Sequence, residues 1–308
     1  MPSLAGLLGG DLRWALGEEG ALPAVPGVGD AAGASCEGAA ASLAHEAPVP
    51  PASPRAMEWR RSDGSLWAAC RVVEGRAEIL VPGTAHYQAE EGGVRATVFA
   101  PEQEGAAVDL YRRFVLPMML QAHGAEALHA SAVVGAQGAV AFCGEAGVGK
   151  STLAYLLGRR GLAAWADDTV VFTGEAGRFR VHRLPFAFRL DPEVRARWGT
   201  GSGDEARGEA APLGAVAVLE RRAGEAGDAA PDLVLRRLAP AEAFRAVMPH
   251  GCAFWLGDQE RNRRMVETYL DLVSAVAIYR VVFRPDLGAA ERLAERIAAA
   301  LLTAPQSP

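Results

Sequence analysis

The chain has 308 residues, of which 50% are hydrophobic and 22% charged, so it can bury one large core or two modest ones. Its formal net charge is −6, which weighs against nucleic acid as a main partner because phosphate backbones bind clustered basic residues. The four cysteines include no C-x-x-C pair, which favours free thiols in a reducing compartment over a zinc site or a disulfide framework.

The chain shows neither a secretory signal nor a membrane span. Residues 1–10 lack a basic segment and a long apolar core. The charge-free stretch 127–144 contains His, Ser, Gln and Gly and divides into two strands and a turn. We therefore expect a cytoplasmic protein with no membrane partner.

Residues 1–104 are expected to form a mostly-β module. Within them, 4–16 favours a short helix or a strand, and 21–55 is rich in Ala, Pro and Gly, which suits a loosely structured segment. Short apolar runs over 57–100 predict a small antiparallel sheet of about four or five strands. This module could recognise a partner or cap the following domain. The expected strands are 57–61, 66–73, 76–81 and 94–99.

Residues 105–308 are expected to form a second, α/β domain. A helix over 105–122 should be kinked or divided at Pro117. The polar, Gly-rich stretch 200–211 predicts an exposed connection or a mobile lid. Further strands are expected at 128–134, 139–143, 162–166, 169–172, 178–182, 186–190, 213–219, 233–238 and 277–283, and helices at 152–160, 192–197, 240–247, 262–275 and 288–302.

Residues 144–151 read Gly-Glu-Ala-Gly-Val-Gly-Lys-Ser, the G-x-x-x-x-G-K-[ST] pattern of a phosphate-binding loop. An apolar strand precedes this loop and a helix follows it, as the motif requires. The chain has 31 Lys and Arg residues, and Lys150 is its one Lys. A compact ammonium fits inside a loop around phosphate, whereas a guanidinium fork does not. The candidate nucleotide-binding residues are Gly144, Glu145, Ala146, Gly147, Val148, Gly149, Lys150, Ser151 and Thr152.

Two acidic residues follow the strand after the loop helix. Of Asp167 and Asp168, one could hold Mg²⁺ together with Ser151, and the other could take a proton from an attacking hydroxyl. The pair could also form a turn, since Asp favours turns. His129 begins a strand pair that returns to the loop, so it is expected near the same edge of the sheet, as a functional or a structural residue.

Three segments resemble the catalytic domain of HPr kinase/phosphorylase: Leu128-His129-Ala130-Ser131, Gly144 to Ser151, and Ala166-Asp167-Asp168. They are still more similar to HPr-kinase-like proteins of bacterial gene clusters, some of which resemble kinases acting on Ser of ribosomal peptide precursors, as in lasso-peptide pathways. The resemblance covers about 110–175 and, loosely, the remainder to 308. It implies a P-loop kinase domain of the HPr kinase/phosphoenolpyruvate carboxykinase type after the mostly-β module.

The resemblance also implies roles for the residues. Lys150 and the backbone of 144–149 would bind the phosphates of ATP, Ser151 and Asp168 would hold Mg²⁺, and Asp167 would be the base. His129 would orient Asp167 or polarise the transferring phosphoryl group.

The chain departs from the family pattern in two ways, lacking an E-I-R-G-like segment with its metal-binding Glu and a C-terminal Gly-Arg-Asn segment. Both departures weigh against HPr as the substrate and against a reverse phosphorylase reaction. The expected function is an ATP-dependent kinase acting on a hydroxyl, foremost Ser of a peptide or protein. The alternatives are a kinase of a small hydroxylated metabolite and a nucleotide-binding regulatory or scaffold protein.

Overall fold

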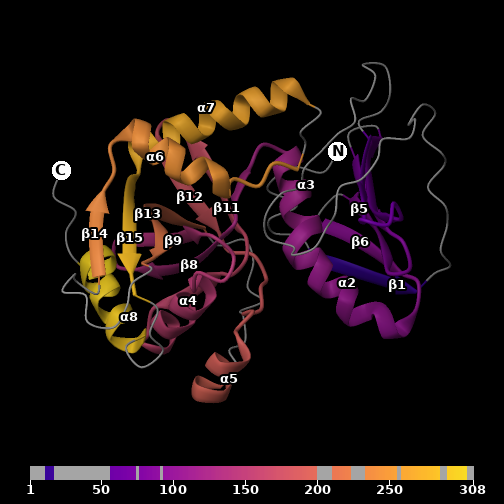
Figure 1. Cartoon of the computed structure of the whole chain (residues 1–308). Helices are drawn as coiled ribbons and strands as arrows, with labels where there is room; N and C mark the ends of the chain where they lie inside the picture. The colour runs from indigo at the N-terminus through magenta and orange to yellow at the C-terminus, as the bar shows by residue number, and fades with distance from the viewer. Residues whose placement is uncertain are drawn as a thin grey trace. The chain divides into compact units, whose positions relative to one another are not determined.

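The computed structural model describes residues 11–16, 56–73, 76–90, 93–199, 210–222, 233–254, 258–284 and 290–303 (Figure 1). The chain divides into two compact units, 1–125 with 253–263, and 126–252 with 264–308. The interpretations of 1–10, 21–55 and 200–209 fall outside the described residues.

The first unit contains a six-stranded sheet of order β1-β6-β5-β4-β3-β2. The module is mostly β, as predicted, but the sequence reading missed the strand over 85–90. Of the two alternatives for 4–16, the structure has a strand over 11–16. β5 alternates buried and half-buried residues along its length, the pattern of a sheet with one covered face. β1 pairs with β6 in parallel, so the sheet is not wholly antiparallel. The strands are β1 (Asp11–Leu16), β2 (Ala56–Arg60), β3 (Leu66–Val73), β4 (Arg76–Val81), β5 (Ala85–Glu90) and β6 (Gly93–Val98).

A helical segment follows the first sheet as η1 (Pro101–Gln103), α2 (Glu104–Leu110), the π-helical turn η2 (Tyr111–Val115) and α3 (Leu116–Ala122). The irregularity expected at Pro117 begins earlier, in η2, where the N–H of Leu116 bonds to the carbonyl of Tyr111, five residues back. Proline cannot donate to the preceding turn, so a widened turn just before it fits the local hydrogen bonding.

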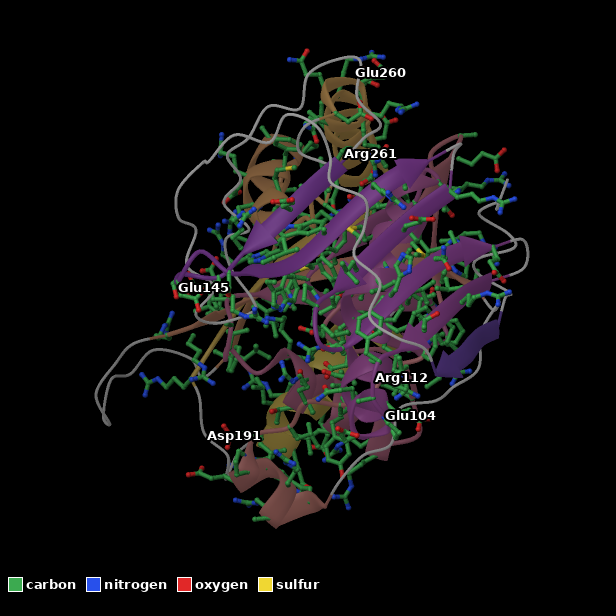
Figure 2. The ribbon with its side chains drawn as sticks, turned by 90° about the vertical axis from the view of Figure 1, so that its right-hand side faces the viewer. Glu104, Arg112, Glu145, Asp191, Glu260 and Arg261 are labelled. Atoms are coloured by element: carbon green, nitrogen blue, oxygen red, sulfur yellow. The ribbon has the colours of Figure 1, made fainter. Side chains whose placement is uncertain are left out.

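This helical segment packs on the first sheet, so the contacts place the division after Ala125, whereas the sequence reading set it at residue 104. The hydroxyl of Tyr87 donates to the carbonyl of Ala107 (2.8 Å), and the ring of Trp59 meets Phe114 edge-on at 5.2 Å. Residues 253–263 belong to the same unit. There, buried Arg261 donates to the carbonyls of Gln121 (3.1 Å) and Ala125 (2.9 Å) (Figure 2).

The second unit is a mixed nine-stranded sheet with the path β10-β8-β9-β13-β12-β11-β7, in which β15 joins β13 and β14. β9, β13 and β15 are parallel, and the other pairings are antiparallel. The carboxyl ends of the three parallel strands therefore meet at one edge, where α/β sheets bind ligands. The strands are β7 (Glu126–Leu128), β8 (Ala130–Gly135), β9 (Gly138–Gly144), β10 (Ala163–Ala166), β11 (Val170–Glu175), β12 (Arg178–His182), β13 (Ala210–Arg221), β14 (Leu233–Arg237) and β15 (Ala277–Phe283).

Two sequence expectations for this sheet were wrong. The strand predicted over 128–134 is interrupted at His129, because β7 pairs with β11 while β8 pairs with β9 and β10. No strand forms over 186–190, where the backbone N–H of Arg189 bonds to the carboxylate of Asp167 (2.9 Å) in place of a neighbouring strand.

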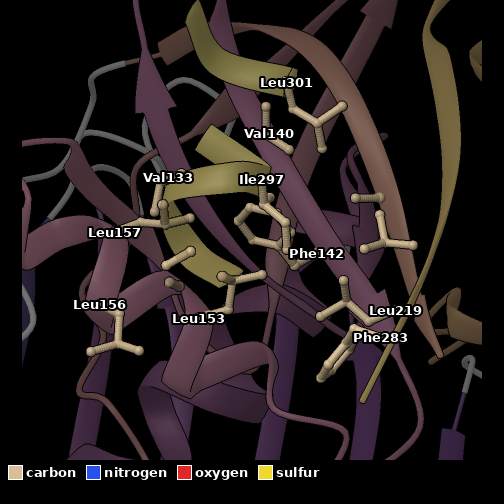
Figure 3. Close-up of a cluster of buried hydrophobic side chains, with 14 of the residues drawn as sticks. Val133, Val140, Phe142, Leu153, Leu156, Leu157, Leu219, Phe283, Ile297 and Leu301 are labelled. Atoms are coloured by element: carbon tan, nitrogen blue, oxygen red, sulfur yellow. The ribbon is translucent and has the colours of Figure 1, made fainter. Parts of the chain in front are cut away.

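Helices α4 and α8 lie side by side in Figure 1 and pack against one hydrophobic face of this sheet. Phe142 of β9 and Leu219 of β13 meet Leu153 of α4 and Ile297 of α8 in a single buried cluster (Figure 3). This packing fixes the strand and the helix that flank the Gly-rich loop. The helical elements are α4 (Lys150–Arg159), α5 (Pro192–Trp198), α6 (Pro240–Val247), η3 (Met248–His250), α7 (Gln259–Ala275), α8 (Ala290–Ala298) and η4 (Ala299–Thr303).

Candidate active site

The predicted phosphate-binding loop connects β9 to α4, within the second unit. Gly149 is the N-cap of α4 with φ 112°, and Gly144 ends β9 with φ 149°. A Cβ at Gly144 would lie 2.7 Å from the carbonyl oxygen of Leu219 and 2.9 Å from Val148 Cγ1, so this position requires glycine. The first N–H groups of α4 have no partner inside the helix and therefore suit an anion.

Lys150 begins α4 and is buried, with 7% of its surface exposed. Its Nζ donates to the carbonyls of Gly144 (2.8 Å) and Glu145 (3.1 Å), so the ammonium lies inside the loop. Burial lowers the pKa of Lys150, and the nearby carboxylates of Asp168 and Asp167 oppose that shift. The loop thus combines helix-end N–H groups with one partly desolvated cation, the arrangement that binds polyphosphate.

The remaining loop residues differ in exposure. Three of them, Glu145 (Figure 2), Ala146 and Gly147, are exposed, Val148 is buried, and Thr152 is half-buried in the first turn of α4.

Asp167 follows β10 and is buried, with 4% of its surface exposed. Its Oδ1 accepts from Ser131 Oγ (2.7 Å) and its Oδ2 accepts from the backbone N–H of Arg189 (2.9 Å). The nearby hydroxyl of Ser151 acts to lower its pKa. Burial raises the pKa of Asp167 despite these bonds. A charged carboxylate kept here costs folding free energy at neutral pH, which is typical of a functional position.

Asp168 is half-buried and has φ 69°, in the left-handed region. The N–H of Thr169 bonds to the carbonyl of Asp167 (2.9 Å), which closes a three-residue turn around Asp168. Such conformations cost about 1–3 kcal/mol and concentrate at functional sites.

His129 lies beside Asp168. Its Nδ1 is 2.9 Å from the carbonyl oxygen of Asp168 and 3.4 Å from Asp168 Oδ1. Burial, followed by the charge of Lys150, lowers the pKa of His129, so its ring is neutral near pH 7. A carbonyl only accepts, so Nδ1 carries the proton and Nε2 is left as an acceptor.

The two aspartates therefore have different partners. Asp167 contacts Ser151, and Asp168 contacts His129. The sequence reading had linked Ser151 with Asp168, and His129 with Asp167 or the phosphoryl group. In the structure Ser151 instead lies by Asp167 and His129 by Asp168, because the turn at 167–169 directs the two aspartate side chains differently.

Three residues near the loop were missed as functional candidates by the sequence reading. Ser131 donates to Asp167 and follows His129 by two residues in the sequence. Arg221 ends β13, and its guanidinium donates to the carbonyls of Gly147 and Val148; it lies just beyond the residues of β13 that pair with β9. His250 accepts, through its backbone carbonyl, the N–H of His129 (2.7 Å). No motif marked His250.

Cysteine chemistry adds nothing to the site. Among the described residues Cys70, Cys143 and Cys252 carry reduced thiols, and burial raises the pKa of Cys143 and Cys252 to about 12. Both thiols stay protonated at neutral pH and are poor nucleophiles.

No cluster of three or more His, Cys, Asp or Glu side chains in the described ranges forms a preassembled metal site. Ser151 and Asp167 nevertheless offer hydroxyl and carboxylate oxygens at the loop. These are donors that suit Mg²⁺, which binds few protein groups and takes its other ligands from water and phosphate.

None of the helices in the part of the chain that the structure describes has the length and apolar character that a membrane span needs.

Comparison with known proteins returns a distant structural match. No protein-family model matches the sequence, and no curated protein matches it. Among solved structures, the HPr(Ser) kinase/phosphatase from Coxiella burnetii is similar to this chain, with a TM-score of 0.32 and 15% sequence identity. The match covers 56% of this chain and 88% of that protein. Similarity at this level establishes neither the family nor the activity of the chain.

Proposed function

We propose that this chain is an ATP-dependent kinase that transfers the γ-phosphoryl group to a serine hydroxyl of a peptide or protein. The observation that supports the proposal is the convergence of three groups at one edge of one unit. These are the phosphate loop with Lys150, the Ser151–Asp167 contact, and the Asp168–His129 contact.

In this proposal the loop and Lys150 bind the triphosphate. The backbone N–H groups of 147–151 would face the phosphate oxygens, and Lys150 Nζ would exchange its carbonyl partners for phosphate oxygen. Charge neutralisation and positioning are the main demands of phosphoryl transfer.

Ser151 and Asp167 are the residues that would hold Mg²⁺. When bound there, the ion would supply positive charge to the triphosphate. The buried Asp167 is fixed by hydrogen bonds from Ser131 and from the N–H of Arg189. A fixed carboxylate is better suited to binding Mg²⁺ than to accepting a proton from a substrate hydroxyl. This reverses the aspartate roles that the resemblance implied.

Asp168 would be the general base. Its carboxylate is half-buried, so an acceptor hydroxyl can reach it, and Nδ1 of His129 holds its carbonyl in place. As the serine oxygen forms its bond to the γ-phosphorus, the bond from that phosphorus to the β–γ bridging oxygen breaks. ADP leaves, and the serine proton passes to Asp168.

Incubation of the chain with γ-labelled ATP and Mg²⁺ tests this proposal, with a library of serine-containing peptides and, in parallel, a panel of small hydroxylated metabolites as acceptors. We expect label on peptide serine, and none with Lys150→Met. Label confined to small hydroxylated metabolites would indicate a metabolite kinase. Tight ATP binding with no transfer to any acceptor would indicate a regulatory nucleotide-binding protein, and either result would contradict the proposal.

A further inference from the structure

Arg189 lies beside the candidate site because its backbone contacts the buried carboxylate there. Its N–H donates to Asp167 Oδ2 (2.9 Å), while Ser131 donates to Oδ1 of the same carboxylate. The Cα of Arg189 is bonded to that nitrogen, so the side chain begins within about 5 Å of Asp167. An extended arginine side chain reaches roughly 7 Å from its Cα, which is enough to reach a ligand bound at Asp167.

The backbone on both sides of Arg189 is held by packed side chains. Phe186 and Leu190 are buried, and the ring of Phe188 meets Tyr155 of α4 edge-on at 5.5 Å. Leu190 packs against Tyr155 in the same small cluster. These contacts fix the point from which the side chain of Arg189 extends, and they do not involve that side chain.

The guanidinium of Arg189 is exposed and has no partner among the described residues, since the recorded hydrogen bond of Arg189 is made by its backbone. Two other arginines of this unit are already engaged. Arg221 donates to the carbonyls of Gly147 and Val148, and Arg159 donates to the carbonyl of Trp198 (2.9 Å). Arg189 can therefore move onto a ligand without breaking a contact.

We propose that Arg189 is a further catalytic residue, whose guanidinium donates to the non-bridging oxygens of the phosphoryl group as that group is transferred. This rests on the proposed function, in which Asp167 helps to hold the ion that binds the triphosphate. Charge spreads over these oxygens in the transition state, and an arginine from the same chain can stabilise it. The guanidinium fork can meet two oxygens at once, and it stays protonated throughout.

Binding of ADP with Mg²⁺ and aluminium fluoride to the full chain tests the proposal without any acceptor. Aluminium fluoride bound beside ADP mimics the phosphoryl group during transfer. We expect aluminium fluoride to tighten ADP binding by wild type by about 100-fold or more, and Arg189→Ala to lose most of that tightening. The Kd for ADP alone should be the same in both proteins, and isothermal titration calorimetry measures all four values.

The variants separate the side chain of Arg189 from its backbone. Arg189→Ala keeps the N–H that bonds to Asp167, so its midpoint of urea unfolding should match that of wild type. Should this variant fail to fold, Arg189→Gln, which keeps most of the stem without the charge, takes its place and should show the same loss. Arg195→Ala removes one charge from an exposed position on α5 and should keep the full tightening.

Kinetics provide a second readout, because a merely structural role would not change kcat alone. Arg189→Ala should lower the kcat for peptide phosphorylation by about 100- to 1,000-fold and leave the KM for ATP within about three-fold of wild type. Arg189→Lys, which keeps the charge but not the fork, should recover part of that loss.

The outcomes distinguish this inference from the proposed function. Equal tightening by aluminium fluoride in wild type and Arg189→Ala overturns the inference alone, and so does a wild type that binds ADP and shows no tightening. Loss of tightening in the variant, with no transfer by wild type to any hydroxyl, supports the inference and overturns the kinase assignment. Failure of wild type to bind ADP overturns both.

Discussion

At the scale of single residues, adjacent aspartates in one turn occupy different environments. Asp167 is buried and accepts from Ser131 and the N–H of Arg189, while Asp168 is half-buried with φ 69° and lies against His129. Asn adopts the left-handed region about as readily as Asp. The two Asn substitutions should therefore differ in their effect on stability.

Asp168→Asn should lower phosphoryl transfer by about 100-fold or more, because the proton acceptor is lost. Its free energy of unfolding should change by less than about 1 kcal/mol, since the turn tolerates Asn. Kinetic assays and urea titrations measure the two effects. Full activity in this variant would show that Asp168 is not the base.

Asp167→Asn should instead destabilise the protein by about 1–2 kcal/mol. The amide would direct an N–H at a position where Ser131 or the N–H of Arg189 already donates, and part of that loss is offset because the buried charge disappears. Urea titration beside Asp168→Asn provides the comparison. Equal stabilities for the two variants would contradict the distinct environments.

His250 also predicts a pH dependence of stability. Its pKa is lowered from 6.5 to about 4 in the folded chain, so the unfolded chain binds more protons between these values. Stability is therefore retained above about pH 6.5 and lost as the pH falls towards 4. Between pH 7 and pH 5, wild type should lose more unfolding free energy than His250→Gln, by up to about 2 kcal/mol before solvent screening of this partly exposed ring reduces the difference. Urea titrations at both pH values measure this difference, and equal losses would contradict it.

At the scale of elements, the loop between β9 and α4 depends on the neighbouring parallel strand. Leu219 of β13 pairs with Gly144, and Arg221 two residues later donates to the carbonyls of Gly147 and Val148. These bonds hold the carbonyls of Gly147 and Val148 on the guanidinium and so fix the backbone of the loop.

Arg221→Ala should raise the KM for ATP by about 5- to 20-fold with a smaller effect on kcat, because charge-assisted bonds that shape the loop are lost. Arg178→Ala, an exposed position on the β11–β12 hairpin, is the matched control. Steady-state kinetics measure both variants. An unchanged KM for Arg221→Ala would show that the loop keeps its shape without the hydrogen bonds from Arg221.

The sequence predicted the loop and most of the elements around it because their signals are local. A Gly-rich turn between an apolar strand and a helix can be recognised from a short stretch of sequence. The same holds for α6, which begins at Pro240 and ends at Val247 as expected. Arg221 and His250 could not be recognised, because their proximity to the loop comes from contacts between segments far apart in the sequence. Ser131 could not be recognised because its partner Asp167 lies 36 residues away in the sequence. The interruption at His129 has a similar cause. Residues 126–128 before it pair with β11, whereas residues 130–135 after it pair with β9.

At the scale of the whole molecule, the candidate site lies entirely in the second unit, while the first unit has its own sheet and core. The division after Ala125 follows from packing, because Tyr111 stacks on Tyr87 and Phe114 meets Trp59 and Trp67. The predicted strands end near residue 99 and a helix is predicted from residue 105, which favoured a boundary at 104, but a sequence pattern does not report which sheet a helix covers.

A variant lacking residues 1–104 should therefore aggregate. Removal of the first sheet would expose the buried aromatic face of α2 and η2, including Tyr111 and Phe114, and large exposed apolar patches promote association. Size-exclusion chromatography and light scattering would show this. A monodisperse, folded product would contradict the assignment of 105–125 to the first unit.

Every assigned role depends on polyphosphate occupying the loop, and the solitary lysine allows a direct test. An amine-selective arylating reagent can modify one lysine side chain in this chain, Lys150, whose lowered pKa favours reaction at mildly alkaline pH. Peptide mass spectrometry would follow the rate of modification. We predict that saturating Mg²⁺–ATP slows it by about ten-fold or more. Modification at the same rate with and without nucleotide would contradict the central claim that ATP binds at Gly144–Ser151.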